Sequence, residues 1–375
     1  TRTYIDRLGS GYEDVRNVVR VFRFYPGVVN DFLLARSRSE LEAMREDLSV
    51  PVANPEILEA RAGLLDLIHV HRSTSRYVKR VLRRLTLRRP TTVLALADDD
   101  ALRTLAQGRL AASERHLERE RQKELLGDYY DMEFLRIAIS TLRGRPTAEV
   151  RSQFFKLTES YLRALFDVCV REVEQEMGQR FVQRDRLGLF LAGGHARRRP
   201  YDEDYDVIAL LDTTDETAWQ FAERAIAKMN RQIARRGVIA QYRIGEELGS
   251  FVTRFAEVAR LLQHDPDGAM VERHQLLGSK LVVGSRRAET ALRRRLLEPH
   301  VFEEAPRVFD RLHRELLERR STSRDLGPEM LHLKEMVGGL REIDLALAAA
   351  KVLHRVYEPL EDLLPLRLAR EDPGH

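Results

Sequence analysis

The stretch LAGGHARRRPYDEDYDVIALL, residues 191–211, carries the most informative pattern in this chain. It begins at the end of an apolar run, turns at Gly193-Gly194, and enters a second apolar run at Asp204-x-Asp206. Side chains alternate between the two faces of a strand, so the two aspartates would lie about 6–7 Å apart on one face. The pattern predicts two strands whose connection holds a glycine turn close to paired carboxylates.

Short apolar segments around this stretch predict a small sheet. Residues 187–192 and 205–211 are the two runs just described, and residues 238–244 alternate as a third strand after a helix at 217–236. Residues 281–284 read as a fourth strand. Short strands joined by helical crossovers are typical of a mixed sheet.

The rest of the chain has helical periodicity. Apolar residues recur every three or four positions between Tyr129 and Met177, with a break at Gly144–Pro146, which predicts a helical hairpin. The fold class is therefore α+β and predominantly helical, with a small mixed-sheet domain flanked by helical domains. We divide the chain into an N-terminal helical region at 1–95, a hairpin leading into the central domain at 96–180, the mixed-sheet domain at 181–290 and a C-terminal helical domain at 291–375.

The composition is that of a folded protein without membrane segments. With 375 residues, 43% of them hydrophobic and 33% charged, the chain can form two or three packed units, which excludes a disordered protein. It has no run of about 18 apolar residues and no signal-peptide pattern, so we expect no membrane partner. The single cysteine, Cys169, can form neither an internal disulfide nor a CxxC zinc site, and we expect a cytoplasmic protein. Because the chain begins at Thr1, we expect it to be part of a longer protein.

The charge balance does not indicate a nucleic-acid-binding protein. The 63 lysine and arginine residues oppose 59 aspartate and glutamate residues, which leaves a net charge of +4. Acidic residues interrupt the basic tracts, whereas a nucleic-acid-binding face needs cations gathered on one side. Nucleic acid is therefore not expected as a partner.

The residue types in the quoted stretch suit a nucleoside triphosphate. Paired glycines let backbone N–H groups approach phosphates without a Cβ in the way, and Arg197 follows them closely enough to contact the same phosphates. Two same-face carboxylates, Asp204 and Asp206, can share hard divalent cations with phosphate oxygens. One cation can activate an attacking oxygen while another neutralises the leaving pyrophosphate. The same D-x-D pattern also occurs beside glycines in plain solvated loops, and that alternative stays open.

A longer resemblance favours nucleotide chemistry. Residues 193–197 (GGHAR), followed by Asp204-x-Asp206, resemble the GG-x-G-R…S-D-x-D-L signature of the DNA-polymerase-β-type nucleotidyltransferase superfamily. The resemblance is to the branch that holds the glutamine synthetase adenylyltransferases and the PII uridylyltransferases. Further tracts resemble segments of that branch in the same order: residues 75–77 (SRY), 132–138 (MEFLRIA) and 334–343 (KEMVGGLREI).

This resemblance implies an enzyme that uses Mg²⁺ or Mn²⁺ and has its nucleotidyltransferase domain at 181–290. Such an enzyme moves a nucleoside monophosphate, in the simplest case AMP from ATP, onto a hydroxyl of a protein similar to glutamine synthetase or PII. The direction, transfer or removal, stays open. By the same resemblance Asp204 and Asp206 are the catalytic and metal-binding residues. The nucleotide-binding residues would be Gly193, Gly194, Arg197, Arg243, Lys334 and Arg341.

Three residues depart from the family pattern. Ala196 replaces a glycine, Glu203 replaces a serine, and Gln241 stands where the adenylyltransferases carry a third carboxylate. A neutral amide cannot act as a general base and is a poor ligand for Mg²⁺. Glu246 or Glu247, just past the predicted strand, could substitute for it. The alternative function is therefore a catalytically impaired, nucleotide-binding regulatory module of a larger protein.

Overall fold

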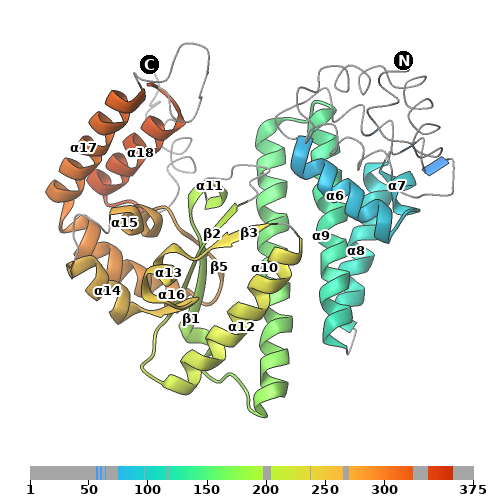
Figure 1. The fold of residues 1–375 in the computed structure, drawn as a ribbon, viewed down its shortest axis with the longest axis horizontal. Helices are drawn as coiled ribbons and strands as arrows, with labels where there is room; N and C mark the ends of the chain where they lie inside the picture. Colours follow the sequence, from blue (N-terminus) through green and yellow to red (C-terminus); the bar gives the residue numbers. More distant parts are fainter. Residues whose placement is uncertain are drawn as a thin grey trace, which may run out of the picture. The chain divides into compact units, whose positions relative to one another are not determined.

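The computed structural model of the chain is mostly helical with a small sheet (Figure 1). The described residues are Glu56, Ile57, Ala60 and Leu64, followed by the ranges 75–96, 98–115, 118–196, 204–236, 238–264, 270–323 and 337–357. Within these ranges no helix is both long enough and apolar enough to cross a membrane. The expected α+β, predominantly helical fold is confirmed at this level.

The chain divides into two compact units, Thr1–Val168 and Cys169–His375, which we call the N-terminal unit and the C-terminal unit. The boundary falls within a long helix, α10 (Thr147–Met177), so this helix contributes residues to each unit. The sheet and both halves of the glycine–aspartate motif belong to the C-terminal unit.

The N-terminal unit is built from helices. Its described helices are α6 (Ser75–Arg88), α7 (Thr92–Ala95), α8 (Asp99–Arg115), α9 (Arg119–Leu142) and the first part of α10. Helices α9 and α10 form the predicted hairpin, and the break comes at Gly144, whose φ of 90° suits a residue without a Cβ. Buried rings join the two helices, because Tyr130 packs on Tyr161 and Phe134 on Phe154 with centroids 4.8 and 5.9 Å apart.

The C-terminal unit is organised around a mixed sheet. Its strands are β1 (Leu187–Leu191), β2 (Asp204–Leu211), β3 (Ile239–Gln241), β4 (Val252–Arg254) and β5 (Lys280–Val283). Strand β1 pairs antiparallel with β2 and with β5. The start of β2 pairs in parallel with β3, and its end pairs in parallel with β4. All of β1 is buried, as expected for a strand that is covered on both faces.

Helices pack around this sheet. In chain order the described ones are η2 (Arg184–Arg186), α11 (Gly193–Ala196), α12 (Glu216–Arg235), α13 (Arg243–Leu248), α14 (Phe255–His264), α15 (Met270–Leu277), α16 (Arg286–Leu292), the π-helix η3 (Arg293–Phe302), α17 (Ala305–Ser323) and α18 (Leu340–His354). Helix α12 contacts β3 and β4, α13 contacts β2 and β4, and α16 contacts β1. A continuous apolar core runs from β1 and β2 to these later helices, through Phe190, Ile208, Leu262, Leu276 and Leu296 among others.

Helix α12 shows how local sequence sets an element of this unit. Asp215 caps it, because its carboxylate accepts a hydrogen bond from the backbone N–H of Thr217 at 2.9 Å. Buried residues recur at helical spacing along one face, from Ala218 through Ile226 to Ile233. The helix predicted at 217–236 is therefore confirmed to within a residue at each end.

The segment predicted as a strand at 238–244 is only partly a strand, and this corrects the prediction. β3 ends at Gln241, and from Arg243 the chain forms α13. The carboxylate of Glu246 accepts from the backbone N–H of Tyr242 at 3.2 Å, and the Glu246 N–H donates to the Tyr242 carbonyl at 2.6 Å. This local capping overrides the alternation of side chains. Strand β4 carries no signal of its own, because three residues are too few to show an alternation.

Candidate functional site

The two halves of the glycine–aspartate motif meet where β1 ends and β2 begins. Leu191 lies opposite Val207 in the antiparallel pair, and the Ala192 N–H donates to the Asp206 carbonyl at 2.8 Å. Gly193 follows with a φ of 60°, and a Cβ at this position would collide with Oδ2 of Asp206. A glycine is therefore required here both by the backbone conformation and by the close approach of the carboxylate.

Strand β2 carries the two motif aspartates at same-face positions. Asp204 and Asp206 are separated by Tyr205, which is buried. The parallel neighbour β3 places Ile239 opposite Asp204 and Gln241 opposite Asp206. Gln241, the residue that the family resemblance aligns with a third carboxylate, is therefore the direct strand neighbour of Asp206.

Arg243 connects these groups. Its Nε lies 3.5 Å from Oδ1 of Asp206, and its Nε and Nη2 donate to Oε1 of Gln241 at 3.2 and 3.0 Å. Half of its side chain is exposed, so the guanidinium can also contact a ligand from the solvent side. A guanidinium has five N–H donors, and these contacts leave some of them for an anion. Of the predicted site residues, the structure thus brings together Gly193, Asp206 and Arg243.

Two of the other predicted residues lie on described helices, and three lie wholly or partly outside the described part of the chain. Gly194 follows Gly193 in the short helix α11, which contacts β2. Arg341 lies in the first turn of α18, a helix that contacts α15, α17 and η3. Arg197 and Lys334 lie outside the described residues, and of Asp204 only the backbone is described.

The two glutamates considered as substitutes for the missing carboxylate lie on α13. Glu246 accepts a hydrogen bond from the Tyr242 backbone N–H, so its carboxylate is already engaged in starting its own helix. Glu247 is exposed. Glu246 therefore acts first as a capping residue, which weakens its case as a base.

Glu272 on α15 is a carboxylate that the sequence analysis does not single out. It is 9% exposed, and its Oε2 has no hydrogen-bond partner among the described residues. Burial raises the pKa of Glu272 and the charge of Glu247 raises it further, while a hydrogen bond from its own backbone and the charges of Arg243 and Arg273 oppose the shift. Glu272 is thus within electrostatic range of Arg243, the residue beside Asp206. A buried carboxylate oxygen without a partner costs stability, so its presence calls for a functional reason.

The next residue, Arg273, fixes the position of α15. Its guanidinium is buried and donates to the backbone carbonyls of His300 at 2.9 Å and Leu262 at 2.8 Å. It also lies 3.4 Å from the carboxylate of Glu304. A buried arginine bonded on three sides cannot move without leaving polar groups unsatisfied. Glu272 is therefore held on a rigid element, as a binding-site residue needs to be.

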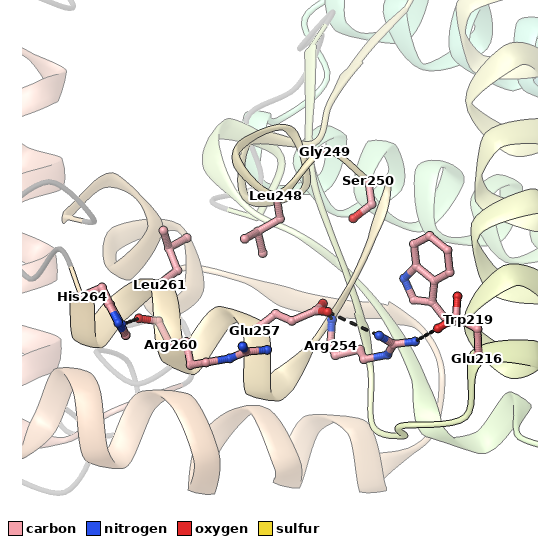
Figure 2. Close-up of a pocket in the computed structure, with 10 residues that line it drawn as sticks. All are labelled: Glu216, Trp219, Leu248, Gly249, Ser250, Arg254, Glu257, Arg260, Leu261 and His264. Atoms are coloured by element: carbon pink, nitrogen blue, oxygen red, sulfur yellow. Dashed lines mark hydrogen bonds and ion pairs between the residues drawn. The ribbon is translucent and has the colours of Figure 1, made fainter.

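A pocket of about 560 Å³ opens near the other end of β2 (Figure 2). It is lined by the start of α12, by the turn at 248–250 and by residues of β4 and α14. Strand β4 pairs with residues 209–211, and the end of β2 at Leu211 lies about 16 Å along the strand from Asp206. None of the predicted site residues is among the described residues that line this pocket. It is therefore separate from the glycine–aspartate motif.

The donor set at the motif suits one hard cation rather than two. Asp204 and Asp206 offer carboxylate oxygens, which Mg²⁺ and Mn²⁺ prefer, but the third position is the amide of Gln241. Within the described ranges no group of three or more His, Cys, Asp or Glu side chains is gathered to hold a metal ion. Mg²⁺ commonly keeps waters and takes further ligands from substrate phosphates. Two carboxylates therefore suffice for one ion that binds together with a nucleotide.

Comparison with known proteins assigns no family. No protein-family model matches the chain, and no curated protein matches it. Function is therefore inferred from the geometry of the site and from the short motifs.

Proposed function

We propose that the C-terminal unit binds a nucleoside triphosphate, ATP in the simplest case, and transfers its nucleoside monophosphate to a hydroxyl of an acceptor protein. The observation that carries this proposal is the close approach of Gly193 and the carboxylate of Asp206, 13 positions further along the chain, which leaves no room for a Cβ. A glycine turn against a carboxylate lets phosphate oxygens meet backbone N–H groups and a carboxylate-bound cation at the same place. The expected acceptor is a protein similar to glutamine synthetase or PII.

The residues at this corner would divide the binding of the phosphates between them. Asp204 and Asp206 would hold Mg²⁺ or Mn²⁺, which when bound neutralises phosphate charge and polarises the reacting phosphoryl group. The backbone N–H groups of Gly193 and Gly194 would donate to phosphate oxygens. Arg243 is half exposed at the Asp206 edge and would place its guanidinium on the same phosphates.

The transfer forms one bond and breaks one. The acceptor oxygen attacks the α-phosphorus, the bond from this phosphorus to the pyrophosphate oxygen breaks, and the hydroxyl proton passes to a base. Gln241 cannot take this proton, because an amide is not basic at neutral pH. We assign the proton to Glu272, whose Oε2 has no other partner among the described residues.

The alternative is a regulatory module that binds the nucleotide without turning it over. Two observations favour this alternative. Gln241 is uncharged beside Asp206, and Arg243 lies within ion-pair distance of the same carboxylate, where it competes with a metal cation. Such a module would keep nucleotide binding and lack metal-dependent transfer, which gives the two functions different outcomes in one experiment.

Incubation of the chain with each labelled nucleoside triphosphate, Mg²⁺ and a cell lysate tests for transfer. We expect a labelled protein band that requires Mg²⁺ or Mn²⁺ and is lost in the double variant Asp204→Asn/Asp206→Asn. Asp215→Asn is the matched control, because asparagine caps a helix as well as aspartate and this residue lies outside the motif. Full labelling by the double variant would overturn the assignment.

A binding measurement separates the enzyme from the regulatory module. ATP with Mg²⁺ should raise the Tm of the wild type, because a ligand that binds only the folded state stabilises it. The double variant should lose this shift. A shift without labelling would establish the regulatory module, and neither shift nor labelling with any nucleotide would exclude both functions.

A further inference from the structure

The pocket near the far end of β2 has the size and the walls of a small-molecule site. Its volume of about 560 Å³ falls within the range of ligand sites, about 300–1,000 Å³. Figure 2 shows three walls: the start of α12 with Trp219, the end of α13 with Leu248, and helix α14 with Leu261. All three walls belong to the C-terminal unit.

Arg254 holds the floor of this pocket in place. Its guanidinium lies 5.6 Å from the centre of the Trp219 ring, 2.6 Å from Glu216 and 3.4 Å from Glu257. The indole Nε1 donates to the Val252 carbonyl at 2.8 Å, which fixes the orientation of the ring. One cation between two carboxylates leaves this end of the pocket with an excess negative charge. Arg254 is therefore already neutralised and does not attract an anion.

An apolar surface faces the hollow. Leu248, the last residue of α13, is 37% exposed, and Leu261 reaches the same space from α14 (Figure 2). Together with the Trp219 ring these side chains form a contact surface for an apolar group. Covering this surface would remove water from it, which favours binding.

Among the described residues, Arg260 on α14 is a cation without an ion-pair partner. Arg260 is exposed, and its hydrogen bond among the described residues runs from Nε to the Ala256 carbonyl at 3.4 Å, so no ion pair engages its Nη groups there. A guanidinium with a free fork matches a carboxylate, because it binds both oxygens side by side. Helix α14 ends at His264, and the carbonyl dipole of a helix C-terminus disfavours anions, a doubly charged phosphate more than a singly charged carboxylate.

We propose that this pocket binds a small monocarboxylate with an aromatic or branched aliphatic body. Arg260 binds the carboxylate, and the body lies on Leu248, Leu261 and Trp219. The excess negative charge around Arg254 rejects a second anionic group, so the pocket discriminates against dianions. The site is separate from the glycine–aspartate motif, and its ligand is not the nucleotide.

Trp219 is the sole tryptophan of the chain, so its fluorescence reports occupancy of the pocket directly. Phenylacetate, 4-methylvalerate, phenylacetamide and phenyl phosphate are titrated into the full chain up to about 10 mM. We expect a saturable change with the two carboxylates. We expect at least about tenfold weaker binding of phenylacetamide and of phenyl phosphate. Phenylacetamide lacks the negative charge, and phenyl phosphate carries two.

Three variants locate the ligand. Arg260→Gln should weaken phenylacetate about tenfold and leave phenylacetamide unaffected. Arg231→Gln removes an exposed arginine of α12 that does not line the pocket and should change neither affinity. Leu248→Ala should weaken both ligands alike, because it removes apolar contact only. All three side chains are exposed, and an unchanged Tm and far-ultraviolet circular dichroism spectrum verify that the variants fold.

Four results would each overturn the proposal. One is the lack of a saturable change with either carboxylate. Equal affinities for phenylacetamide and phenylacetate would mean that the pocket recognises the apolar body and not the carboxylate. Tighter binding of phenyl phosphate would make it a phosphate site. An unchanged affinity of Arg260→Gln for phenylacetate would place the carboxylate elsewhere.

Discussion

Helix α9 of the N-terminal unit and helix α15 of the C-terminal unit both bury carboxylates, and they treat them differently. On α9, Asp131 accepts from Arg84 at 2.7 Å and Asp128 accepts from Arg89 at 3.0 Å. On α15, one oxygen of Glu272 has no partner among the described residues. Paired buried charges serve the fold, whereas an unpaired one costs stability and is typical of a site that awaits a ligand.

The same comparison explains one of the sequence motifs. In the tract at 132–138, Arg136 donates to Glu133 at 2.9 Å and to Asp99 at 3.2 Å. Asp99 also accepts from Ser140 at 3.0 Å. This network joins α8 to α9 inside the N-terminal unit. The contacts of this tract therefore hold α8 and α9 together, which is a structural role.

Breaking the paired network should have the largest effect. Arg136→Met leaves the buried Glu133 without the arginine that pairs with it and removes one of the cations beside the partly exposed Asp99, so the free energy of unfolding should fall by about 3 kcal/mol. Arg103→Met is the control, because this arginine is 46% exposed and contacts Asp99 from the surface. It should cost less than about 1 kcal/mol. Urea unfolding followed by circular dichroism measures both, and equal losses would mean that the buried network does not stabilise this unit.

Adding a carboxylate beside Asp206 should have the next largest effect. Gln241→Asp adds a carboxylate ligand beside Asp206 and should raise Mg²⁺-dependent transfer at least about tenfold, because a firmly held cation neutralises the phosphates better, while Gln241→Ala should give no gain. Initial rates of label transfer with Mg²⁺ measure this. If the wild type is already fast and the aspartate variant gains nothing, another carboxylate such as Glu272 supplies the base, and the regulatory-module alternative is wrong.

Removing the buried charge of Glu272 should stabilise the fold and reduce label transfer. Burial raises the pKa of Glu272 above its ordinary 4.5. Protonated Glu272 therefore contributes to the stability of the fold below pH 4.5, and this contribution is lost as the pH rises through the raised pKa. At pH 7, Glu272→Gln should raise the free energy of unfolding by about 1 kcal/mol.

Urea midpoints of the wild type and of Glu272→Gln at pH 7 and below pH 4.5 test this, because the gain in the free energy of unfolding should vanish in acid. Glu114→Gln, an exposed position on α8, should show no gain at either pH. Label transfer should fall in Glu272→Gln alone. A stability gain without loss of transfer would show that Glu272 is not the base, and a loss of stability at pH 7 would show that its charge is paired after all.

The contribution of the paired carboxylate Asp99 to the free energy of unfolding should depend on pH in the opposite sense to that of Glu272. This is the smallest of the expected effects. Burial raises its pKa, but the hydrogen bond from Ser140 and the charges of Arg136 and Arg145 outweigh burial and hold the pKa below the ordinary 3.8. Its contribution is present above pH 3.8 and lost as the pH falls through the lowered value. Because Asp99 is 27% exposed, the pH-dependent part should be under about 1 kcal/mol.

The measurement compares the wild type with Asp99→Asn in urea at pH 7 and in acid below pH 3.8. The wild type should have the larger free energy of unfolding at pH 7. The difference in this free energy between the wild type and the variant should become smaller in acid. A difference that widens in acid would reverse the sign of the coupling and contradict the paired network.

The sequence by itself determined the elements whose signals are local. The hairpin of α9 and α10, the helix α12, the strands β1 and β2 and the same-face spacing of Asp204 and Asp206 all follow from side-chain periods of 3.6 and 2 residues. The need for glycine at 193 was also readable from the motif, although the structure supplies its reason, the close approach of Asp206.

The tertiary structure alone decided which distant residues meet. Four features depend on such contacts: the end of β3 at Gln241, the pairing of β4 with β2, the burial of Glu272 and the pocket around Trp219. Each of them either joins segments that lie far apart in the chain or depends on a single hydrogen bond. No local period encodes such contacts, because they depend on how the packed elements leave space and charge between them. That is why the glycine–aspartate motif could be predicted, whereas the burial of Glu272 and the pocket around Trp219 could not.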